Sequence, residues 1–529
     1  MSSIDIEATL VELQKRDIVR RIWHRDYTIW KPEPKEITNR LGWLNITDQM
    51  NKELFALTAF ADGIHQAGFQ NVVLLGMGGA SLGAEVLRQV FGSIAGYPEL
   101  IVLDSTVPAW VLAVSEAINP ARTLFLVSSK SGGTIETLSL YKYFRSKVEQ
   151  VVGKKHAGQN FVTITDPGTS LVELAKEADF RHTFLNPPDI GGRYSVLSYF
   201  GLVPAALIGV NIAKLLERAD NMRKACILNT LQNPGALLGA IMGNSALRGQ
   251  DRLTLITSPS IGSFGLWLEQ LIAESTGKDN KGIIPIVGEP IMDPAYYGNN
   301  RLFVYLRLED DDNVTTDATI KNLKASGQPI VKLDLDDRYG LGAEFFRWEF
   351  ATAVAGAILG IHPFDQPDVQ ATKDATGRLL IEFRVSGRLP KILAPRSLEY
   401  LLNNAKPDKY LSIMTYLHQT PEVDEALIEL RGKLLAKYQV ATTSSYGPRL
   451  LHSTGQLHKG GPNTGLFLQI TAEHRQDLPI PDEPFTFSVL ADAQALGDFE
   501  ALQSVGRNIA RIHLWTDEGK AIKSLSELI

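Results

Sequence analysis

One short turn, Ser128–Thr134, combines hydroxyl side chains with a lysine and two glycines. An apolar run, Leu124–Val127, precedes this turn, and a helical pattern begins near Ile135. A turn between a strand and a helix gathers hydroxyls, one ammonium group and free backbone N–H groups around one point, which is the environment that a phosphate dianion prefers. The segment therefore predicts a phosphate-binding loop. An ordinary turn capped by serine or threonine is the alternative interpretation.

A second small-residue turn, Gly76–Gly83, follows a predicted strand, Val72–Leu75, and opens an amphipathic helix. Its glycine spacing approaches the dinucleotide-binding fingerprint, which also needs an acidic residue after a second strand. The best candidate for that residue is Asp104, which follows the predicted strand Leu100–Leu103. A nicotinamide-dependent enzyme therefore stays open as an alternative.

Two further segments each present one charged side chain. The segment Gly191–Ser198 places Arg193 before a helical pattern, and Glu274 ends an apolar helix predicted for Gly265–Glu274. The helix dipole disfavours a carboxylate at that end unless a cation compensates it. The structural alternatives are an ion-pair partner for Arg193 and a solvated helix end for Glu274.

A fifth segment, His362–Lys373, carries an amide and a cation. Gln366 and Lys373 are seven residues apart, so they would share one face if the chain after Pro367 is helical. Taken alone, Lys373 would be interpreted as a charged surface residue. The presence of all five segments in one chain is what favours chemistry over these local alternatives.

Predicted strands alternate with predicted helices through most of the chain. This pattern indicates an α/β fold in which parallel sheets are flanked by helices. The strands are expected at Val72–Leu75, Leu100–Leu103, Leu124–Val127, Asn160–Ile164, Leu253–Ile256, Leu302–Leu306, Ile330–Leu335 and Leu466–Thr471. The first seven form two successive α/β halves that look like a duplication, whereas the fold of residues 390–529 does not follow from the pattern.

The length of 529 residues is too great for one hydrophobic core. We expect an N-terminal helical arm over residues 1–50 and a first domain with the phosphate loop over residues 51–215. A second domain with the carboxylate base is expected over residues 216–385, and a C-terminal extension over residues 386–529.

Composition excludes several classes of partner. The 53 basic and 59 acidic side chains give a formal charge of -6 without long runs of one sign, so neither nucleic acid nor an anionic membrane is indicated. No apolar stretch reaches the roughly 20 residues of a membrane-spanning helix, and no secretory signal is visible. The lone Cys226 fits a reducing cytoplasm. No His-x-His or H-E-x-x-H cluster is found, so we expect neither a metal nor a cofactor.

In their order along the chain and in their residues, these segments resemble the phosphoglucose isomerase family, whose two sugar-isomerase (SIS) domains share one active site. The resemblance covers roughly residues 70–375. Its motifs are the phosphate loop S-K-S-G-G-T, the arginine motif G-G-R-Y-S, the base motif E-S-T-G-K and the late motif F-D-Q-P-D-V-Q-A-T-K. The N-terminal W-K-P-E-P-K-E-I and the C-terminal H-S-T-G-Q-L-H-K-G-G-P-N-T-G are similar to the isomerase half of transaldolase and glucose-6-phosphate isomerase fusion proteins.

The resemblance implies a role for each segment. The 6-phosphate of a sugar would be held by Ser129, Lys130, Ser131 and Thr134, and the backbone would approach the sugar at Gly78 and Gly79. Glu274 would move a proton between C2 and C1, and Arg193 would stabilise the enediolate. Gln366 and Lys373 would close over the substrate, with Lys373 near the ring oxygen. Such a reaction needs one base, one cation and a remote anchor for the substrate, which these groups supply.

Two positions depart from the family pattern. Ala80 stands where the family's glycine turn usually continues with a serine. The family's ring-opening histidine lies in a loop downstream of the base, and this chain has no histidine between Glu274 and Asn300. A similar string, S-T-G-Q-L-H, occurs near the C-terminus, so His458 is the first candidate for ring opening. His452 and His362 are the second and third.

The resulting prediction is a cytoplasmic aldose-ketose isomerase that interconverts glucose 6-phosphate and fructose 6-phosphate through a cis-enediol. One alternative is an isomerase that also accepts mannose 6-phosphate, and another is a non-catalytic phosphosugar-binding SIS module. The resemblance suggests a homodimer. A C-terminal segment that substitutes for a partner's loop would instead complete the site within one chain.

Overall fold

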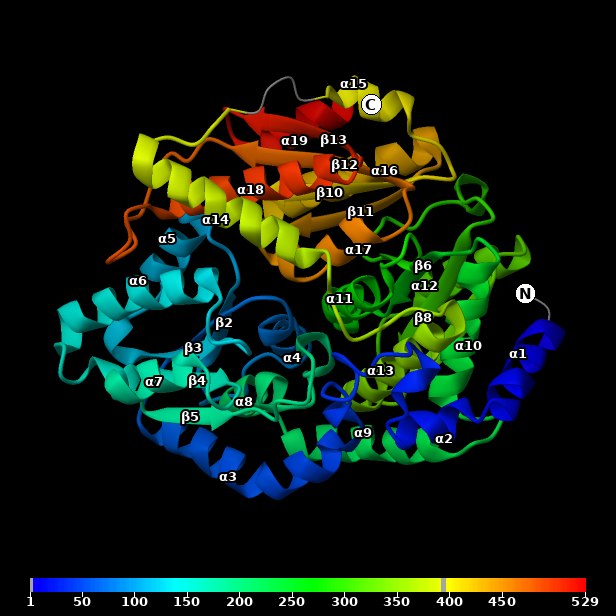
Figure 1. Cartoon of the computed structure of the whole chain (residues 1–529), viewed down its shortest axis with the longest axis horizontal. Helices are drawn as coiled ribbons and strands as arrows, with labels where there is room; N and C mark the ends of the chain where they lie inside the picture. The colour runs from blue at the N-terminus through cyan, green and yellow to red at the C-terminus, as the bar shows by residue number, and fades with distance from the viewer. Residues whose placement is uncertain (1–2, 392–395) are drawn as a thin grey trace.

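The computed structural model describes residues 3–391 and 396–529, and its strands form three parallel sheets covered by helices (Figure 1). The first sheet has the order β2-β1-β3-β4-β5. Its strands are β1 (Asn71–Gly76), β2 (Glu99–Leu103), β3 (Thr123–Ser128), β4 (Phe161–Thr165) and β5 (His182–Leu185). All neighbouring strands in it are parallel, which confirms the predicted α/β class.

The second and third sheets repeat the same strand order, β7-β6-β8-β9 and β11-β10-β12-β13. The second contains β6 (Arg252–Thr257), β7 (Ile284–Ile286), β8 (Arg301–Leu308) and β9 (Ile330–Leu335). The third contains β10 (Tyr410–Tyr416), β11 (Ala441–Tyr446), β12 (Gly465–Ala472) and β13 (Asn508–Leu514). In each sheet the chain adds its second strand on one side of the first and its third strand on the other. This reversal creates a crevice at the carboxyl ends of the strands, where ligands bind in such folds.

The C-terminal part of the chain is therefore a third α/β unit. We call residues 398–527, which contain the third sheet and helices α15 to α19, the C-terminal unit. The strands of the first, second and third sheets lie within the expected segments 51–215, 216–385 and 386–529. The residues at which one segment ends and the next begins stay a prediction.

Helices flank each sheet. The first sheet is accompanied by α3 (Ile46–Gln66), α4 (Leu82–Phe91), α5 (Pro108–Ala117), α6 (Ile135–Val152), α7 (Ser170–Glu177) and α8 (Tyr199–Leu207). Next come α9 (Ile212–Ile227), α10 (Pro234–Leu247), α11 (Phe264–Thr276), α12 (Val314–Ala325), α13 (Gly340–Leu359) and α14 (Val369–Ser386). The C-terminal unit holds α15 (Leu398–Asn403), α16 (Pro421–Tyr438), α17 (Gly455–Gly460), α18 (Phe487–Ser504) and α19 (Glu518–Glu527).

Helix α11 lies at the centre of the molecule, where the three groups of elements meet (Figure 1). It contacts α4 beside the first sheet, α13 beside the second and α17 of the C-terminal unit. Every residue from Trp267 to Thr276 is buried, so the helix is covered on all sides. An apolar helix with no solvent face fits this position because each side of it packs on a different unit.

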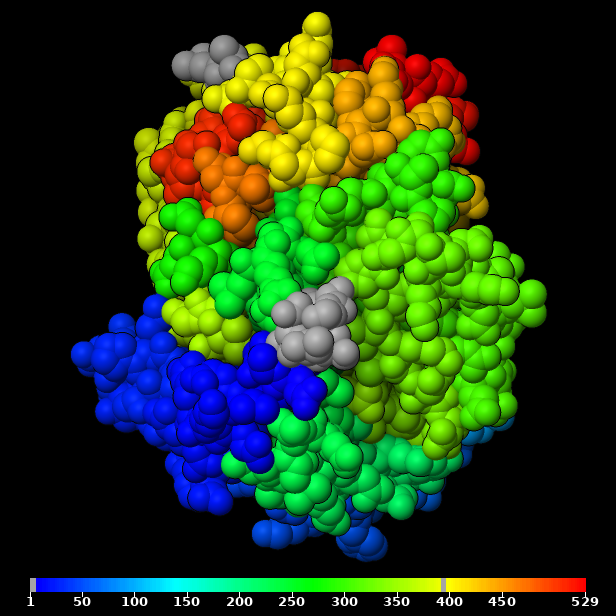
Figure 2. Space-filling model, turned by 90° about the vertical axis from the view of Figure 1, so that its right-hand side faces the viewer, coloured from blue at the N-terminus to red at the C-terminus, as the bar shows by residue number. Residues whose placement is uncertain are grey.

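The N-terminal arm consists of α1 (Ser3–Lys15), α2 (Ile18–Trp23) and short turns that follow them. Figure 2 shows this blue segment against green residues, and α1 contacts α10 while α2 contacts α9. The indole nitrogens of Trp23 and Trp30 donate to the carbonyls of Cys226 and Ala353, at 2.9 Å and 2.8 Å. Tryptophan side chains thus fix the arm to the second half of the chain.

Buried charges join the C-terminal unit to the second sheet. Arg431 of α16 donates to the carbonyls of Val287 and Gly288, both at 2.8 Å. The carboxylate of Glu289 accepts from the backbone N–H of Thr442 at 2.6 Å and pairs with Arg301 at 2.8 Å. Such pairs are costly to break because a lone buried charge remains. The C-terminal unit is therefore firmly docked.

Within the residues described, no helix has both the length and the apolar character that crossing a membrane requires.

Replacing Arg301 with Met leaves Glu289 without its cation in a position where both side chains are almost fully buried. We expect this change to cost about 3–5 kcal/mol of folding free energy and to lower the midpoint of thermal unfolding, measured by calorimetry. The matched control is Arg378→Met, because Arg378 is exposed and pairs with exposed carboxylates, worth at most about 1 kcal/mol. Equal midpoints for the two variants would contradict the assigned role of the buried pair.

Candidate active site

The glycine turn and the hydroxyl turn lie side by side at the carboxyl edge of the first sheet. β1 and β3 are neighbours, and Gly76 at the end of β1 pairs with Ser128 at the end of β3. The Ser128 hydroxyl donates to the carbonyl of Ala80 at 3.0 Å. Because this is the point where the strand order reverses, both turns border the crevice in which such sheets bind ligands.

The predicted phosphate loop presents its hydroxyls near the N-terminus of α6. The hydroxyls of Ser129 and Thr134 are hydrogen-bonded to each other at 2.8 Å, and Ser131 is exposed. Lys130 forms an ion pair with Asp166 and donates to the carbonyl of Pro188 at 3.3 Å. Burial raises the pKa of Asp166 although Lys130 opposes that shift. The loop therefore offers hydroxyls, a lysine and the first N–H groups of an 18-residue helix to an anion.

Gly78 and Gly79 allow very close backbone approach. A Cβ atom on Gly79 would lie 2.1 Å from the carbonyl oxygen of Gly192, next to Arg193. Gly78 has a positive φ of 55°, and a Cβ atom there would lie 2.4 Å from the carbonyl oxygen of His452. Only glycine fits these positions. The turn consequently brings the arginine segment and a C-terminal histidine segment to the edge of the first sheet.

Arg193 is the most strongly held side chain of the site. It is 2% exposed, and its guanidinium donates to the Ser275 hydroxyl at 2.8 Å and to the Gln366 side-chain oxygen at 3.0 Å. It also donates to the carbonyls of Pro363 and Asp365, at 2.7 Å and 2.9 Å. A guanidinium with this many fixed partners cannot swing away, so its charge stays at one place.

Glu274 lies in the last turn of α11, as the sequence predicts. Its carboxylate is 3.3 Å from the guanidinium of Arg193, which is the compensating cation that a carboxylate at this end of a helix needs. Gln270, one turn earlier, donates to Glu274 at 3.0 Å and to the carbonyl of His452 at 2.8 Å. The carboxylate is thus held between the arginine segment and the histidine segment, and its side chain is 11% exposed.

His452 connects this carboxylate to the phosphate loop. Its Nε2 atom is 2.8 Å from the carboxylate of Glu136, in the first turn of α6 and two residues after Thr134. Burial opposes ionisation of Glu136, but the charge and hydrogen bond of His452 hold the pKa of this carboxyl below its ordinary value. The His452 side chain is 20% exposed, so a ligand can reach it.

The other two candidate histidines lie differently. His458 is buried in α17, where Nε2 is 3.3 Å from the Ser412 hydroxyl and the ring packs on Phe467. Burial lowers its pKa well below the ordinary value. His362 has both ring nitrogens engaged, with the carbonyl of Lys35 and the N–H of Phe364. Gln270 therefore joins His452 to Glu274 through the His452 backbone carbonyl, whereas His458 is buried beside Ser412 and the ring of His362 is fixed beside Asp365. The sequence signal is the string H-S-T-G-Q-L-H, which contains both C-terminal histidines.

Gln366 and Lys373 do not share a helical face, which corrects the expectation from their spacing. α14 begins only at Val369, so Gln366 lies before the helix and contacts Arg193 from the segment that precedes it. Lys373 is exposed on α14, and its charge acts on Glu136. Gln366 thus lies beside Arg193, whereas Lys373 lies nearer to Glu136.

Asp104 is not available for a dinucleotide ribose. It is buried, and both of its oxygens accept from the guanidinium of Arg449, at 2.7 Å and 2.8 Å. The acidic residue that a dinucleotide site would need is therefore used to dock the C-terminal unit.

A buried lysine lies close to Arg193 and Glu274. Lys278 pairs with Asp365 at 2.7 Å, and the backbone carbonyl of Asp365 accepts from Arg193. Burial, together with the charge of Arg193, lowers the pKa of Lys278 to about 7, although Asp365 opposes the shift. The sequence pattern gives no separate signal for this residue, since it is simply the last letter of E-S-T-G-K.

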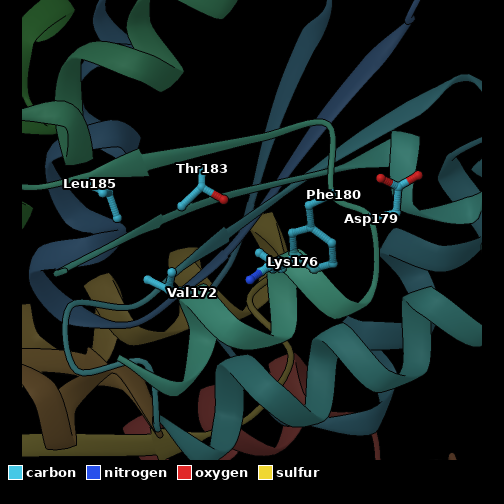
Figure 3. Close-up of a pocket in the computed structure, with 7 residues that line it drawn as sticks. Val172, Lys176, Asp179, Phe180, Thr183 and Leu185 are labelled. Atoms are coloured by element: carbon cyan, nitrogen blue, oxygen red, sulfur yellow. The ribbon is translucent and has the colours of Figure 1, made fainter. Parts of the chain in front are cut away.

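Two hollows of the surface lie away from this cluster. One cavity of about 370 Å³ lies between α7 and β5 and is shown in Figure 3. Its walls are formed by Val172, Ala175, Lys176, Asp179, Phe180, Thr183 and Leu185. A second, of about 350 Å³, lies between α1, α10 and α13. Neither is lined by a residue of the cluster, and the polar groups that could do chemistry converge elsewhere. Within residues 3–391 and 396–529, no group of three or more His, Cys, Asp or Glu side chains is arranged to hold a metal ion.

Comparison with known proteins agrees with the motifs. The family model for phosphoglucose isomerase matches residues 45–284, which contain the phosphate loop, Arg193 and Glu274. The glucose-6-phosphate isomerase of Enterococcus faecalis is 29% identical over 381 residues, which cover 63% of this chain and 85% of that protein. A probable glucose-6-phosphate isomerase of Methanococcus maripaludis is 27% identical over 382 residues, covering 64% of this chain and 84% of that protein.

Two solved structures share the fold. A glucose-6-phosphate isomerase from Chlamydia trachomatis superposes with a TM-score of 0.62 at 19% identity, covering 73% of this chain and 87% of that one. A hypothetical protein from Thermus thermophilus gives the same TM-score of 0.62 at 22% identity, covering 73% of this chain and 98% of that one. At these identities the similarity concerns the fold.

The pKa of Lys278 generates a prediction for stability against pH. Between about 7 and the ordinary value of 10.5, the unfolded chain binds more protons at this residue than the folded chain does. The free energy of unfolding of the wild type should therefore rise with pH in this window, relative to Lys278→Met. We expect the unfolding midpoint of the wild type minus that of Lys278→Met to be larger at about pH 9.5 than at about pH 6.5. The exposed control Lys154→Met should give a constant difference, and a constant difference for Lys278→Met would refute the assignment.

Proposed function

We propose that this chain interconverts glucose 6-phosphate and fructose 6-phosphate by moving a proton between C2 and C1 of the open-chain sugar, because the phosphoglucose isomerase family model matches residues 45–284 and the relatives that it resembles are named glucose-6-phosphate isomerase. The observation that carries this proposal is the Glu274 carboxylate held 3.3 Å from the buried guanidinium of Arg193. A base beside a fixed cation is what removal of a proton next to a carbonyl group requires.

We assign the phosphate of the substrate to the loop between β3 and α6. The hydroxyls of Ser129, Ser131 and Thr134, the ammonium group of Lys130 and the N-terminus of α6 together suit a dianion. Lys130 would exchange its pairing with Asp166 for the phosphate. Binding at this remote anchor orients the sugar toward the base, and Gly78 and Gly79 leave room for it to lie against the backbone.

We assign ring opening to His452. Opening a cyclic sugar removes a proton from the anomeric hydroxyl and delivers one to the ring oxygen. Nε2 of His452 donates to the carboxylate of Glu136, so in the neutral form of the ring, which is the form that acts as a base, Nδ1 has the lone pair. Nδ1 can therefore accept the hydroxyl proton. Lys373, whose charge acts on Glu136 from α14, fits the role at the ring oxygen.

The proton transfer follows. Glu274 takes the proton from C2 of the aldose, the electrons move toward the C1 oxygen, and a cis-enediolate forms. Arg193 stabilises the negative oxygen because its guanidinium is already fixed by Ser275, Gln366 and two carbonyls, so no reorganisation is needed. Within the enediolate the hydroxyl proton passes from O2 to O1, and Glu274 returns its proton to C1, which gives the ketose with its carbonyl group at C2.

All the residues assigned here belong to one chain, so a homodimer would not be needed to complete the site. We propose a cytoplasmic location and no nucleic-acid partner. The buried, single Cys226 and the charge of -6 support these two points.

Replacing Glu274 with Gln keeps the size of the side chain and removes the base. We expect kcat for fructose 6-phosphate to fall by at least about 10³-fold, while a phosphorylated acyclic aldonate still stabilises the variant against heat. The control is Glu217→Gln, an exposed carboxylate on α9, which should keep wild-type turnover. A Glu274→Gln enzyme with more than a tenth of the wild-type kcat would show that another group is the base.

Two histidine variants separate the candidates for ring opening. His452→Gln should lower kcat about 10²-fold or more with ring-form substrate, and it should still bind the acyclic aldonate, which needs no ring opening. His458→Gln should keep kcat per folded molecule, because His458 is buried against Ser412. The opposite pattern, with turnover lost only in His458→Gln, would assign ring opening to His458.

A further inference from the structure

Helix α18 of the C-terminal unit contributes a buried amide next to the pair formed by His452 and Glu136. Gln494 is 2% exposed, and both ends of its amide are engaged. Its Nε2 atom is 2.6 Å from the Glu136 carboxylate, and its Oε1 atom is 2.7 Å from the hydroxyl of Thr106. Thr106 follows β2 in the first sheet, so this amide spans two units of the fold.

The chemistry of the partners fixes the orientation of this amide. A carboxylate accepts hydrogen bonds and cannot donate them, so the NH₂ group of Gln494 must face Glu136. The amide oxygen then faces Thr106, whose hydroxyl donates to it. The reverse orientation would put the amide oxygen against a negative charge. Thr106 thereby holds the donating end of Gln494 on Glu136.

Glu136 receives two hydrogen bonds on the same oxygen, one from Gln494 and one from His452. The titratable groups that face it from other elements are His452, Lys373 of α14 and, more remotely, Tyr416 of β10. A buried carboxylate remains ionised only when such donors and charges offset its desolvation. Each donor therefore helps to keep Glu136 negative.

The histidine segment has an independent anchor at the same turn. Arg449, three residues before His452, makes two hydrogen bonds to the buried Asp104, which itself accepts from the Ser81 hydroxyl at 3.2 Å. Asp104 and Thr106 thus receive one side chain each from two separate helices of the C-terminal unit. The contact between Arg449 and Asp104 positions the backbone of the histidine segment. The contact between Gln494 and Thr106 positions Glu136, which holds the ring of His452.

We infer that Gln494 and Thr106 are positioning residues for ring opening: they keep Glu136 ionised and aimed at Nε2 of His452, so that Nδ1 remains the base. This inference rests on the proposed function. It makes the C-terminal unit, which lies outside the matched residues 45–284, a working part of the active site.

The test uses the full chain with Gln494→Leu and Thr106→Val, and Thr106→Ser as the conservative rescue. Losing the donor raises the pKa of Glu136, so the acidic limb of the kcat profile should move to higher pH in both variants. We expect kcat to fall about tenfold in Gln494→Leu with KM nearly unchanged, and Thr106→Ser to behave as the wild type. Thermal unfolding of each variant reports whether it is folded.

A second readout does not depend on turnover. The ¹⁵N shifts of a histidine ring identify which nitrogen carries the proton, so they can be followed for His452 at about pH 8. The wild type should hold the proton on Nε2, whereas Gln494→Leu should show a mixture of tautomers. Folded variants with unchanged tautomer and pH profile would overturn the inference alone. If the wild type lacks isomerase activity and the Gln494→Leu substitution still changes the tautomer of His452, the proposed function is overturned instead.

Discussion

The buried guanidinium of Arg193 is the interaction on which the arrangement depends. A cation taken out of water is tolerated only when a counter-charge and hydrogen-bond acceptors replace the lost solvent. Glu274 supplies the charge, while Ser275, Gln366 and the carbonyls of residues 363 and 365 supply acceptors. These partners come from the end of α11 and from the segment before α14. Placing one cation therefore fixes three segments that are distant in the sequence, and it does so around Glu274, the proposed base.

The three sheets explain how separate segments can reach this cation. Each sheet reverses its strand order beside its first strand, so each has a crevice at the carboxyl ends of its strands. The first sheet contributes the glycine turn and the phosphate loop, and the second contributes α11 with Glu274. The C-terminal unit contributes His452 through the short helix that follows β11. Close approach at Gly78 lets the first sheet, α11 and the C-terminal unit meet, because a Cβ atom there would lie 2.4 Å from the carbonyl oxygen of His452 and 3.0 Å from the side-chain nitrogen of Gln270.

The sequence predicts the parts of this fold whose residues are uniformly apolar. The strands β1, β3 and β8 are largely continuous apolar runs, and this composition makes them visible. β7 is only three residues long and contains Pro285, and β11 reads A-T-T-S-S-Y, so neither has a strand signal. At the site, the motifs identify Arg193 and Glu274, since each lies in a short string with its own local pattern. The sequence ranks His452 behind His458 because the position of His452 depends on contacts with Gly78 and Glu136, which no local pattern encodes.

The phosphate loop and Glu274 are expected to bind the two ends of a single hexose phosphate, and every assigned role depends on this. The most direct measurement is a crystal structure of the wild type with a phosphorylated acyclic aldonate that mimics the enediolate. We predict the phosphate on Ser129, Ser131 and Thr134, with the carbons that correspond to C1 and C2 beside the carboxylate of Glu274 and the oxygens facing Arg193. A phosphate bound at any other place, or a sugar chain that does not reach Glu274, would contradict this central claim.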